Sequence, residues 1–366
     1  MSSELEELRA SIRGIDEQMV RLIARRTATA GAIGRIKKRI GLPLRDWEVE
    51  KDALAFAERA AKEIGISPTL VRSVVQLLIA EARSEQERRS FSGTAGTGES
   101  ILIVGGRGKM GQWFSDFLLN QGHRVEIYDI RAPDSDSIQA TPLTAHLARN
   151  SMVLVATPLE TVPVVIAELA DARYPGIVFD IASLKGHLKR AIAKARQSGL
   201  SATSIHPLFG PSARTLSDKV ICVCDCGDTQ ATRRVRALFR ETAATLVDLS
   251  FDEHDSIMSY VLALSHLINI VFAAVLSKSG YTFDRLEQVG SATFHSQMVT
   301  TSTLIEENPD LYFSIQRLNP FAAELFQRLN DEVDVLTSAV LSNDRSAFVE
   351  TMLAARRWKA GSETKP

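Results

Sequence analysis

The chain has 366 residues, more than one hydrophobic core usually organises, so we expect two or three domains. Lys and Arg total 43 against 44 Asp and Glu, and this balance leaves no positive field that would hold a nucleic-acid backbone or an anionic membrane. The N-terminus has no apolar signal segment and no apolar stretch looks long enough to span a bilayer, which predicts a cytoplasmic protein that acts on small molecules.

Residues 1–90 have the pattern of three helices. Apolar residues recur at steps of three and four from Leu5 to Leu22, which predicts one long amphipathic helix over about residues 5–38. A second helical pattern runs from about 47 to 64, and Ser67-Pro68 is typical of the N-cap and first turn of a third helix. A long helix with an unbroken apolar stripe usually has a partner, so we expect this unit to dimerise through its long helices.

A linker is predicted over residues 91–99, which are rich in Gly, Ser and Thr and show no periodicity. In residues 100–250 short β-rich runs alternate with helical stretches, the pattern of a parallel sheet covered by helices. These runs are 101–104, 125–128, 152–156, 177–180, 220–224 and 245–249. In residues 251–366 long helical patterns replace them, at 257–277, 286–307 and 322–342. The predicted fold is therefore all-α, then α/β, then all-α.

The three cysteines, Cys222, Cys224 and Cys226, alternate along one predicted strand and so share one face of the sheet. Their spacing fits neither a redox CxxC motif nor a zinc knuckle. A shared metal ion is one interpretation. Buried, reduced cysteines that pack within a strand are the more common case, so we predict no metal site.

A glycine-rich loop, Gly106-Arg107-Gly108-Lys109-Met110-Gly111, follows the first predicted strand and precedes a helical pattern, as in the dinucleotide-binding unit of the Rossmann fold. Gly106 would allow the tight turn, Gly108 the approach of the backbone to a pyrophosphate, and Gly111 the packing of helix on strand. Asp129, at the end of the next strand, would bind both ribose hydroxyls and repel a 2′-phosphate, which predicts NAD over NADP. The alternative is a glycine turn in an ordinary α/β domain.

Polar residues follow three later strands, where an open α/β sheet places its ligands. Thr157 is assigned to the cofactor together with Lys109 and Met110, and Ser183 and His206 follow two further strands. Proline and glycine neighbours fix the loop around His206, which suits a proton acceptor that titrates near neutrality. His254 and His266, in the C-terminal helical region, are as readily packing residues as functional ones.

Polar side chains are also spread over the N-terminal helices: Arg9, Arg26, Lys37, Asp46, Glu50 and Gln86. From the residues alone these form a solvated helix face.

Together with the order of the domains, several motifs resemble those of the fused chorismate mutase–prephenate dehydrogenases of tyrosine biosynthesis, over essentially the entire chain. On the mutase side they are Leu8-Arg9, Ala24-Arg25-Arg26, Gly34-Arg35-Ile36-Lys37, Gly41-Leu42-Pro43 and Glu48-Val49-Glu50. On the dehydrogenase side they are Val104-Gly105-Gly106, the segments 180–185 and 206–211, Glu253-His254-Asp255 and the segment 308–312.

The resemblance implies a three-helix mutase domain, an NAD-binding Rossmann domain and a helical substrate and dimerisation domain, in a homodimer. In the mutase half, Arg26 and the partner chain's Arg9 would bind the two carboxylates and Lys37 and Gln86 would face the ether oxygen. Glu50 would hold the C4 substituent, with Asp46 also in the substrate set.

In the dehydrogenase half, the resemblance implies that His206 accepts the proton of the C4 substituent while C4 gives hydride to NAD and carbon dioxide leaves. Ser183 and His266 would hold the substrate.

Two positions depart from the family pattern. Val49 stands where the mutases have an arginine, and His295 stands where the dehydrogenases have an arginine for the ring carboxylate. Neither Val49 nor His295 can replace an arginine, whose side chain is permanently charged and binds a carboxylate through two hydrogen bonds. We therefore predict a shifted substrate, the 4-amino-4-deoxy analogues of chorismate and prephenate, whose C4 ammonium would be attracted by Glu50 and repelled by an adjacent arginine. Ordinary chorismate and prephenate, and a mutase half that is only a dimerisation or regulatory module, remain alternatives.

Overall fold

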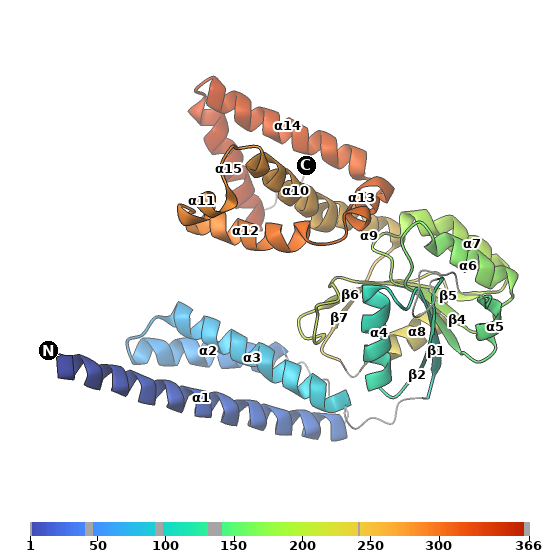
Figure 1. Cartoon of the computed structure of the whole chain (residues 1–366), viewed down its shortest axis with the longest axis horizontal. Coiled ribbons are helices and arrows are strands. Elements are labelled where there is room, and N and C mark those ends of the chain that lie inside the picture. Colours follow the sequence, from blue (N-terminus) through green and yellow to red (C-terminus); the bar gives the residue numbers. More distant parts are fainter. Residues whose placement is uncertain (1, 41–46, 92–97, 131–140, 241, 362–366) are drawn as a thin grey trace. The chain divides into compact units, whose positions relative to one another are not determined.

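The computed structural model describes residues 2–40, 47–91, 98–130, 141–240 and 242–361 (Figure 1). The chain forms two compact units. One comprises residues 1–183 and 188–250, and the other comprises residues 184–187 and 251–366. The short segment 184–187 therefore belongs with the C-terminal helices, although it follows a strand of the sheet.

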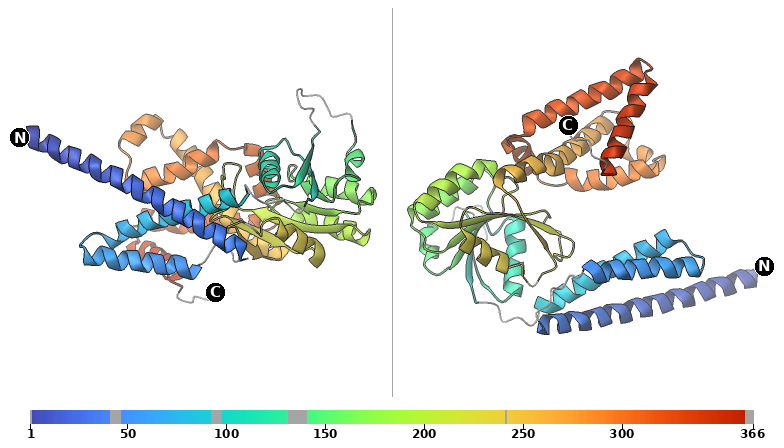
Figure 2. Two further views of the ribbon diagram at one scale, coloured as in Figure 1. Left: turned by 90° about the horizontal axis from the view of Figure 1, so that it is seen from below. Right: turned by 180° about the vertical axis from the view of Figure 1, so that it is seen from behind.

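The N-terminal region consists of the helices α1 (Ser2–Arg39), α2 (Trp47–Glu63) and α3 (Pro68–Phe91), and both α1 and α2 pack on α3. The predicted N-cap of α3 is confirmed, because the Ser67 hydroxyl accepts a hydrogen bond from the Leu70 N–H at 3.3 Å. The N-terminal end of α1 extends past the two shorter helices (Figure 2). The apolar residues of α1 from Leu5 to Leu22 are at least half exposed in the single chain, so the stripe that predicts a partner helix is uncovered.

The central region is a seven-stranded sheet in the order β2-β1-β3-β4-β5-β6-β7. The strands are β1 (Ser100–Val104), β2 (Arg124–Tyr128), β3 (Met152–Val155), β4 (Ile177–Asp180), β5 (Ser201–Pro207), β6 (Val220–Cys224) and β7 (Thr245–Asp248). The prediction of a parallel sheet is right for β1 to β5 and wrong for β6, which pairs antiparallel with β5. The physical reason is that no helix stands between β5 and β6, whereas a parallel pair needs a long crossover.

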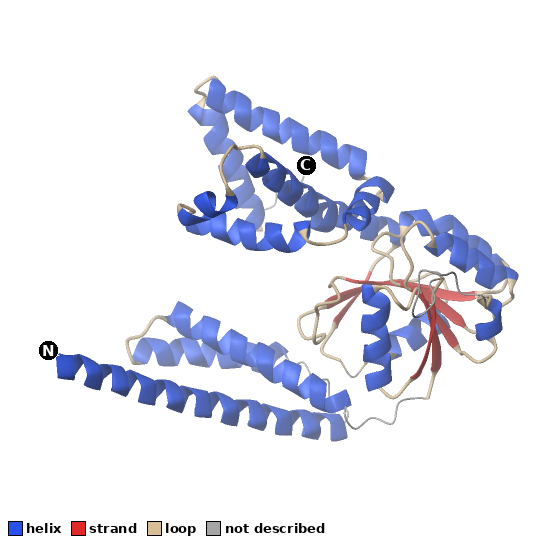
Figure 3. Ribbon diagram, viewed as in Figure 1, coloured by secondary structure: helices blue, strands red, loops and turns tan. Residues whose placement is uncertain are grey.

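Helices cover both faces of the sheet (Figure 3). They are α4 (Lys109–Asn120), α5 (Thr144–Leu147), α6 (Val162–Asp171), α7 (Lys189–Gln197) and α8 (Thr229–Ala237), while the 3₁₀ turn η1 (Gly186–Leu188) begins in the segment that belongs with the C-terminal helices. α4 and α8 share one core with the sheet, in which Phe117 of α4 stacks on Phe239 with ring centroids 5.6 Å apart. α6 and α7 pack on each other on the opposite face.

The strand β5 is absent from the predicted strands because its residues are mostly small and polar. It is buried nonetheless, since it lies between β4 and β6 and is covered on both faces. Its hydroxyls find partners inside the domain; for example, Thr203 Oγ1 lies 2.9 Å from Thr232 Oγ1. His206 therefore lies on a buried strand, and the prediction that it sits in a loop is wrong.

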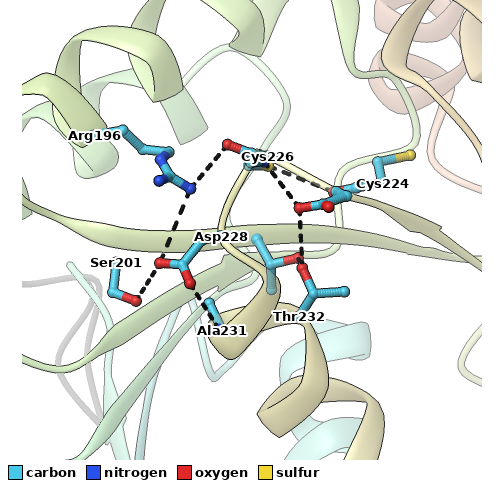
Figure 4. A network of polar contacts seen from close by, with 10 residues as sticks. Arg196, Ser201, Cys224, Cys226, Asp228, Ala231 and Thr232 are labelled. Carbon is cyan, nitrogen blue, oxygen red and sulfur yellow. Dashed lines mark hydrogen bonds and ion pairs between the residues drawn. The ribbon is translucent and has the colours of Figure 1, made fainter.

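The prediction that all three cysteines share one strand is wrong for Cys226, which lies beyond the end of β6 and is half-buried, while Cys222 and Cys224 are buried on it. The Cys226 carbonyl accepts a hydrogen bond from Arg196 at 3.0 Å, and Arg196 also lies 3.9 Å from Asp228, the N-cap of α8 (Figure 4). This network fixes the loop between β6 and α8. None of the three cysteines forms a disulfide, and the described part of the chain contains no cluster of His, Cys, Asp or Glu that could hold a metal ion.

The C-terminal region is helical. It contains α9 (Phe251–Met258), the π-helical segment η2 (Ser259–Leu264), α10 (Ser265–Ser277), α11 (Phe283–Gln288), α12 (Ala292–Ile305), α13 (Pro309–Leu318), α14 (Ala322–Leu341) and α15 (Arg345–Lys359). The single helix predicted over 286–307 is wrong, because Gly290 separates α11 from α12. Ser291 then caps the new helix by accepting a hydrogen bond from the Phe294 N–H at 3.2 Å.

The continuous helical stretch Phe251–Ser277 has a mean hydropathy of 2.0 over its most apolar window, and only 17% of that window is buried. By length and composition it could cross a membrane, so the expectation that no such stretch exists is wrong. These two properties do not distinguish a membrane span from an apolar helix that another protein surface covers.

Candidate active sites

The turn after β1 depends on Gly105, which has φ +82° and donates its N–H to the Tyr128 carbonyl at 2.8 Å. The sequence assigned this turn to Gly106, one residue later. Gly106 is instead packed closely, since a Cβ there would lie 2.6 Å from Ile127. A Cβ on Gly111 would overlap the backbone of the same turn, so α4 packs directly on the loop at Gly111, as its position in the motif predicts.

The N-terminus of α4 offers an anion site. Gly108 is its N-cap, in an extended conformation (φ −64°, ψ 156°), and no side chain caps the helix. A Cβ on Gly108 would meet only the Gly105 carbonyl, at 3.3 Å, so the space beside it is open. The first turn, with exposed Lys109 and half-buried Met110, thus presents backbone N–H groups and a helix dipole to an anion such as a pyrophosphate.

Asp129 directly follows β2 and lies beside the glycine loop, where its Oδ2 accepts a hydrogen bond from the Arg107 N–H at 3.1 Å. β2 neighbours β1, so this carboxylate stands at the edge of the sheet where a dinucleotide places its adenosine ribose. The tight turn, the open helix N-terminus and the carboxylate together fit NAD.

Three further predicted residues lie at the same edge of the sheet. Thr157 follows β3, Ser183 follows β4, and His206 is the penultimate residue of β5; these three strands are adjacent and parallel. His206 is buried, and its strand partner on β6 is Cys222. Thr157 Oγ1 is buried without a hydrogen-bond partner among the residues that the structure describes, so a polar atom there is available to a ligand.

Asp255 of α9 fixes the segment that follows Ser183. Its two carboxylate oxygens accept hydrogen bonds from the Lys185 and Gly186 N–H groups at 2.8 and 2.6 Å. The imidazole Nδ1 of His254 lies 2.8 Å from Asp255 Oδ1, and both side chains are fully buried. The sequence analysis left His254 open between packing and function, and it included Asp255 only as part of a resembling motif, with no role assigned.

His266, at the start of α10, is partly buried against Tyr312, with ring centroids 4.5 Å apart. Burial lowers its pKa to about 4, so the ring is neutral at pH 7. Its Nδ1 has no hydrogen-bond partner within the described ranges.

His295 is exposed in the first turn of α12. The structure does not bring it beside His266. α10 and α12 pack antiparallel, because Phe272 contacts Phe294 while Asn269, one turn earlier on α10, bonds Thr301. The two histidines thus lie towards opposite ends of this helix pair.

The N-terminal helices form an open pocket of about 490 Å³. Its charged lining comes from Arg26 and Lys37 of α1, Glu50 of α2 and Arg83 of α3. The rest is apolar or small: Thr29, Ala30, Ile33, Val49, Ala53, Ile79 and Ala82. Arg26 donates a hydrogen bond to the Leu78 carbonyl at 2.6 Å, which ties α1 to α3, and burial lowers the pKa of its guanidinium.

The structure therefore brings the predicted residues Arg26, Lys37 and Glu50 together. Arg9 is exposed and lies 17 positions before Arg26 on the same helix, about 26 Å along the axis, so it cannot reach this pocket within one chain. Asp46 lies outside the described residues. Gln86 belongs to α3, but its side chain is also outside the described part.

Arg83 was not predicted from the sequence. Its Nη1 lies 3.4 Å from Glu50 Oε2, and its Nη2 contacts Asp218 in the loop before β6. The available signal was helical spacing: Ile79, Ala82 and Arg83 share one face of α3 at steps of three and four, so Arg83 is a charge on an otherwise apolar face.

Three family models match successive parts of the chain. Chorismate mutase type II matches residues 8–87, the nucleotide-binding domain of prephenate dehydrogenase matches 120–248, and the dimerization domain of prephenate dehydrogenase matches 250–354. The chain belongs to the fused chorismate mutase–prephenate dehydrogenase family. It is thus an enzyme with an isomerase half and an oxidoreductase half. The second match begins after the glycine loop, so the assignment of that loop depends on its geometry.

A T-protein of Enterobacter agglomerans is 26% identical over 358 residues, 98% of this chain and 94% of that protein. A 4-amino-4-deoxyprephenate dehydrogenase of Streptomyces pristinaespiralis is 24% identical over 264 residues, 68% of this chain and 86% of that protein. The crystal structure of prephenate dehydrogenase from A. aeolicus, in complex with hydroxyphenyl propionate and NAD+, has a TM-score of 0.57 at 17% identity and covers 72% of this chain and 98% of that one. At that identity the likeness shows the fold.

Proposed function

We propose that residues 1–90 rearrange a chorismate-type dicarboxylate and that residues 100–250 and 251–366, joined to them by the linker 91–99, oxidise and decarboxylate the product with NAD. The pocket of the N-terminal helices and the edge of the sheet at β3 to β5 are the two sites. The single observation that carries the mutase assignment is that Arg26, Lys37 and Glu50 line one pocket.

The mutase chemistry is a pericyclic rearrangement, which needs no nucleophile from the protein. The pocket has to hold a compact conformer and stabilise negative charge on the breaking ether oxygen. Arg26 binds a carboxylate and Lys37 faces the ether oxygen together with Gln86. Arg9 comes from a second subunit, which is consistent with its distance from the pocket of its own chain, and Asp46 and Glu50 bind near C4.

In the dehydrogenase half, a ring nitrogen of His206 takes the proton of the C4 substituent, while Ser183 and the neutral His266 hold the substrate. His295 lies towards the other end of the α10–α12 pair from His266, so in this proposal it would reach the substrate only from a second subunit. Bound NAD supplies the hydride acceptor. Gly106, Gly108, Lys109, Met110, Gly111 and Thr157 hold the cofactor, and Asp129 selects NAD. The substrate gives up hydride from C4, a proton and carbon dioxide as its ring becomes aromatic.

We further propose that the substrates carry an amino group at C4, as in 4-amino-4-deoxychorismate and 4-amino-4-deoxyprephenate, on the way to p-aminophenylalanine. The supporting observation is Val49, which lines the pocket directly before Glu50. Without an arginine at that position, the carboxylate of Glu50 can attract a C4 ammonium. Similarity to a 4-amino-4-deoxyprephenate dehydrogenase over 68% of the chain supports the same class of substrate in the second half.

Ordinary chorismate and prephenate, giving 4-hydroxyphenylpyruvate, are the second candidate. Two observations favour them: the guanidinium of Arg83 lies 3.4 Å from Glu50, and the T-protein similarity extends over 98% of the chain.

The enzyme is proposed to be a cytoplasmic homodimer. The uncovered apolar stripe of α1 and the exposed apolar helix Phe251–Ser277 would be its subunit contacts, the latter within the match to a dimerization domain. In this arrangement a second subunit, rather than a membrane, covers the C-terminal helix. A mutase half that serves only as a dimerisation module is disfavoured by the cationic pocket.

The decisive experiment supplies the purified full chain with either chorismate or 4-amino-4-deoxychorismate, first without and then with NAD, and identifies the products by mass spectrometry. A higher kcat/KM with the amino substrate supports the proposal, and equal or better turnover of chorismate removes it. Rearrangement without NAD refutes the non-catalytic alternative. The variant Val49→Arg with His295→Arg should shift preference towards the hydroxyl substrates, and no shift would count against our reasoning.

A further inference from the structure

Arg83 is buried in the wall of the mutase pocket and has an unused donor. Its side chain is only 10% exposed. Its Nε is buried and has no hydrogen-bond partner in the described part of the chain. Because a buried polar group without a partner costs free energy, a bound anion would satisfy this donor.

The bond from Arg83 to Glu50 is weak for an ion pair. Nη1 lies 3.4 Å from Glu50 Oε2, whereas charge-assisted bonds of this kind are about 2.7–2.9 Å long. Nη2 contacts Asp218, whose side chain is 45% exposed. A carboxylate that enters the pocket can therefore compete for the guanidinium.

Arg83 and Val49 line the same pocket as Glu50, from two helices. Val49 directly precedes Glu50 on α2, and Arg83 reaches Glu50 from α3, which packs on α2. All three residues line the pocket. An arginine at position 49 or at position 83 would thus add its charge to the same region of the wall.

We propose that Arg83 is a substrate-binding residue of the mutase site, which supplies from α3 the carboxylate-binding cation that Val49 does not supply from α2. This inference rests on the proposed mutase function of the pocket. Together with Arg26 and Lys37 it gives the pocket three cations for a substrate with two carboxylates. Arginine suits this role because its guanidinium stays charged when buried and its planar donors match a carboxylate.

The same residue links carboxylate binding to recognition at C4. In the free enzyme the guanidinium of Arg83 offsets part of the charge of Glu50. A substrate carboxylate that draws Arg83 towards itself leaves more of the charge of Glu50 for a donor at C4, either a hydroxyl or an ammonium. Arg83 on α3 and Glu50 on α2 therefore select a substrate that has both a carboxylate and a hydrogen-bond donor at C4.

The test uses Arg83→Met in the full chain, which removes the charge and keeps most of the side-chain volume. The probe is a bicyclic dicarboxylate ether that mimics the compact rearranging ring system, and its affinity is measured by isothermal titration calorimetry. We expect binding to weaken about 30-fold or more, as for the loss of a buried charged hydrogen-bond donor. The kcat/KM of the rearrangement should fall in parallel, while oxidation of directly added prephenate, or of its 4-amino analogue, stays within about twofold.

Arg72→Met is the matched control. Arg72 also stands on α3 and pairs with Glu58 on α2, but neither residue lines this pocket. We expect its affinity for the probe to be unchanged. In Arg83→Met, the second substitution Val49→Arg should restore about tenfold in affinity by placing a cation on α2. Arg83→Lys, which keeps a charge, should lose less affinity for the probe than Arg83→Met. The lysine variant replaces the methionine variant in the test if the latter does not fold.

The outcomes separate the two proposals. Unchanged probe affinity in Arg83→Met, or equal losses in Arg83→Met and Arg72→Met, overturns the role of Arg83 and leaves the mutase function in place. A wild-type chain that neither binds the probe nor rearranges either substrate refutes the mutase function and the role of Arg83 with it.

Discussion

The two glycines at the start of α4 allow folding and cofactor binding to be perturbed separately. Gly111→Ala would put a methyl group against the backbone of the preceding turn, 2.7 Å from Gly106 Cα. Gly108→Ala would put one 3.3 Å from the Gly105 carbonyl oxygen, with no other atom within 4 Å. We expect the first variant to lose stability, and the second to keep its fold and lose affinity for NAD.

The magnitudes follow from these contacts. Carbon atoms pack about 3.5–4.0 Å apart, so Gly111→Ala forces α4 to move by about 1 Å against a backbone that has no side chain to rotate away. Overpacking of this kind costs about 1–3 kcal/mol, and the higher helix propensity of alanine returns up to about 1 kcal/mol, for a net loss of about 1–2 kcal/mol.

Gly108 already has a φ that alanine adopts, so the second variant should lose less than about 1 kcal/mol of stability. Its methyl group would stand where the backbone must approach the pyrophosphate, and we expect NAD binding to weaken at least about tenfold, or 1.4 kcal/mol.

Thermal unfolding reports the stability of both variants. Titration with NAD, followed through the fluorescence of Trp113 on α4, reports affinity, since this indole is held by a 2.6 Å hydrogen bond to the Ala213 carbonyl near the cofactor loop. Mutase activity is the internal control for correct folding of the N-terminal helices. A Gly111→Ala chain as stable as the wild type, or a Gly108→Ala chain with full affinity for NAD, would refute the reasoning.

Three further substitutions test the dehydrogenase half. Asp129→Ala removes the ribose carboxylate and should lower the preference for NAD over NADP at least about tenfold, measured as the ratio of kcat/KM values; an unchanged ratio would contradict its role. His206→Asn should lower the kcat of NADH formation about 100-fold or more while NAD affinity is kept, and near-normal kcat would exclude it as the proton acceptor. For His266, burial lowers the pKa from 6.5 to about 4, so the unfolded chain binds more protons in this range. The stability that the neutral ring contributes is present above pH 6.5 and is lost as the pH falls to about 4, by roughly 2 kcal/mol because water still reaches part of the ring. His266→Gln should flatten the melting temperature over this range, and an unaltered pH profile would argue against the buried neutral ring.

Local patterns determined most of the secondary structure. The apolar periodicity of α1, the Ser67-Pro68 cap of α3 and the glycine loop before α4 depend on neighbours within one or two turns, so the sequence alone identified them. The resemblance named residues for both sites, and three of those for the mutase, Arg26, Lys37 and Glu50, line one pocket.

Contacts between distant segments determined the rest. The sequence of β5 predicts a loop because most of its residues are small and polar. The strand is buried only because it lies between β4 and β6, and this position places His206 on a strand. Gly105 adopts a positive φ in the turn where its N–H bonds to the carbonyl at the end of β2, about 23 positions later in the chain.

For two polar contacts, no local pattern in the sequence indicated which residues would be partners. Asp255 binds Lys185 and Gly186, about 70 positions earlier in the chain, and Arg83 reaches Glu50 from another helix. The sequence by itself determined the three N-terminal helices, the strands of the sheet other than β5, and the family of chemistry that they carry. Only the tertiary structure decided which charge stands beside Glu50, because a charged residue on one helix meets its partner only when a second helix packs against it.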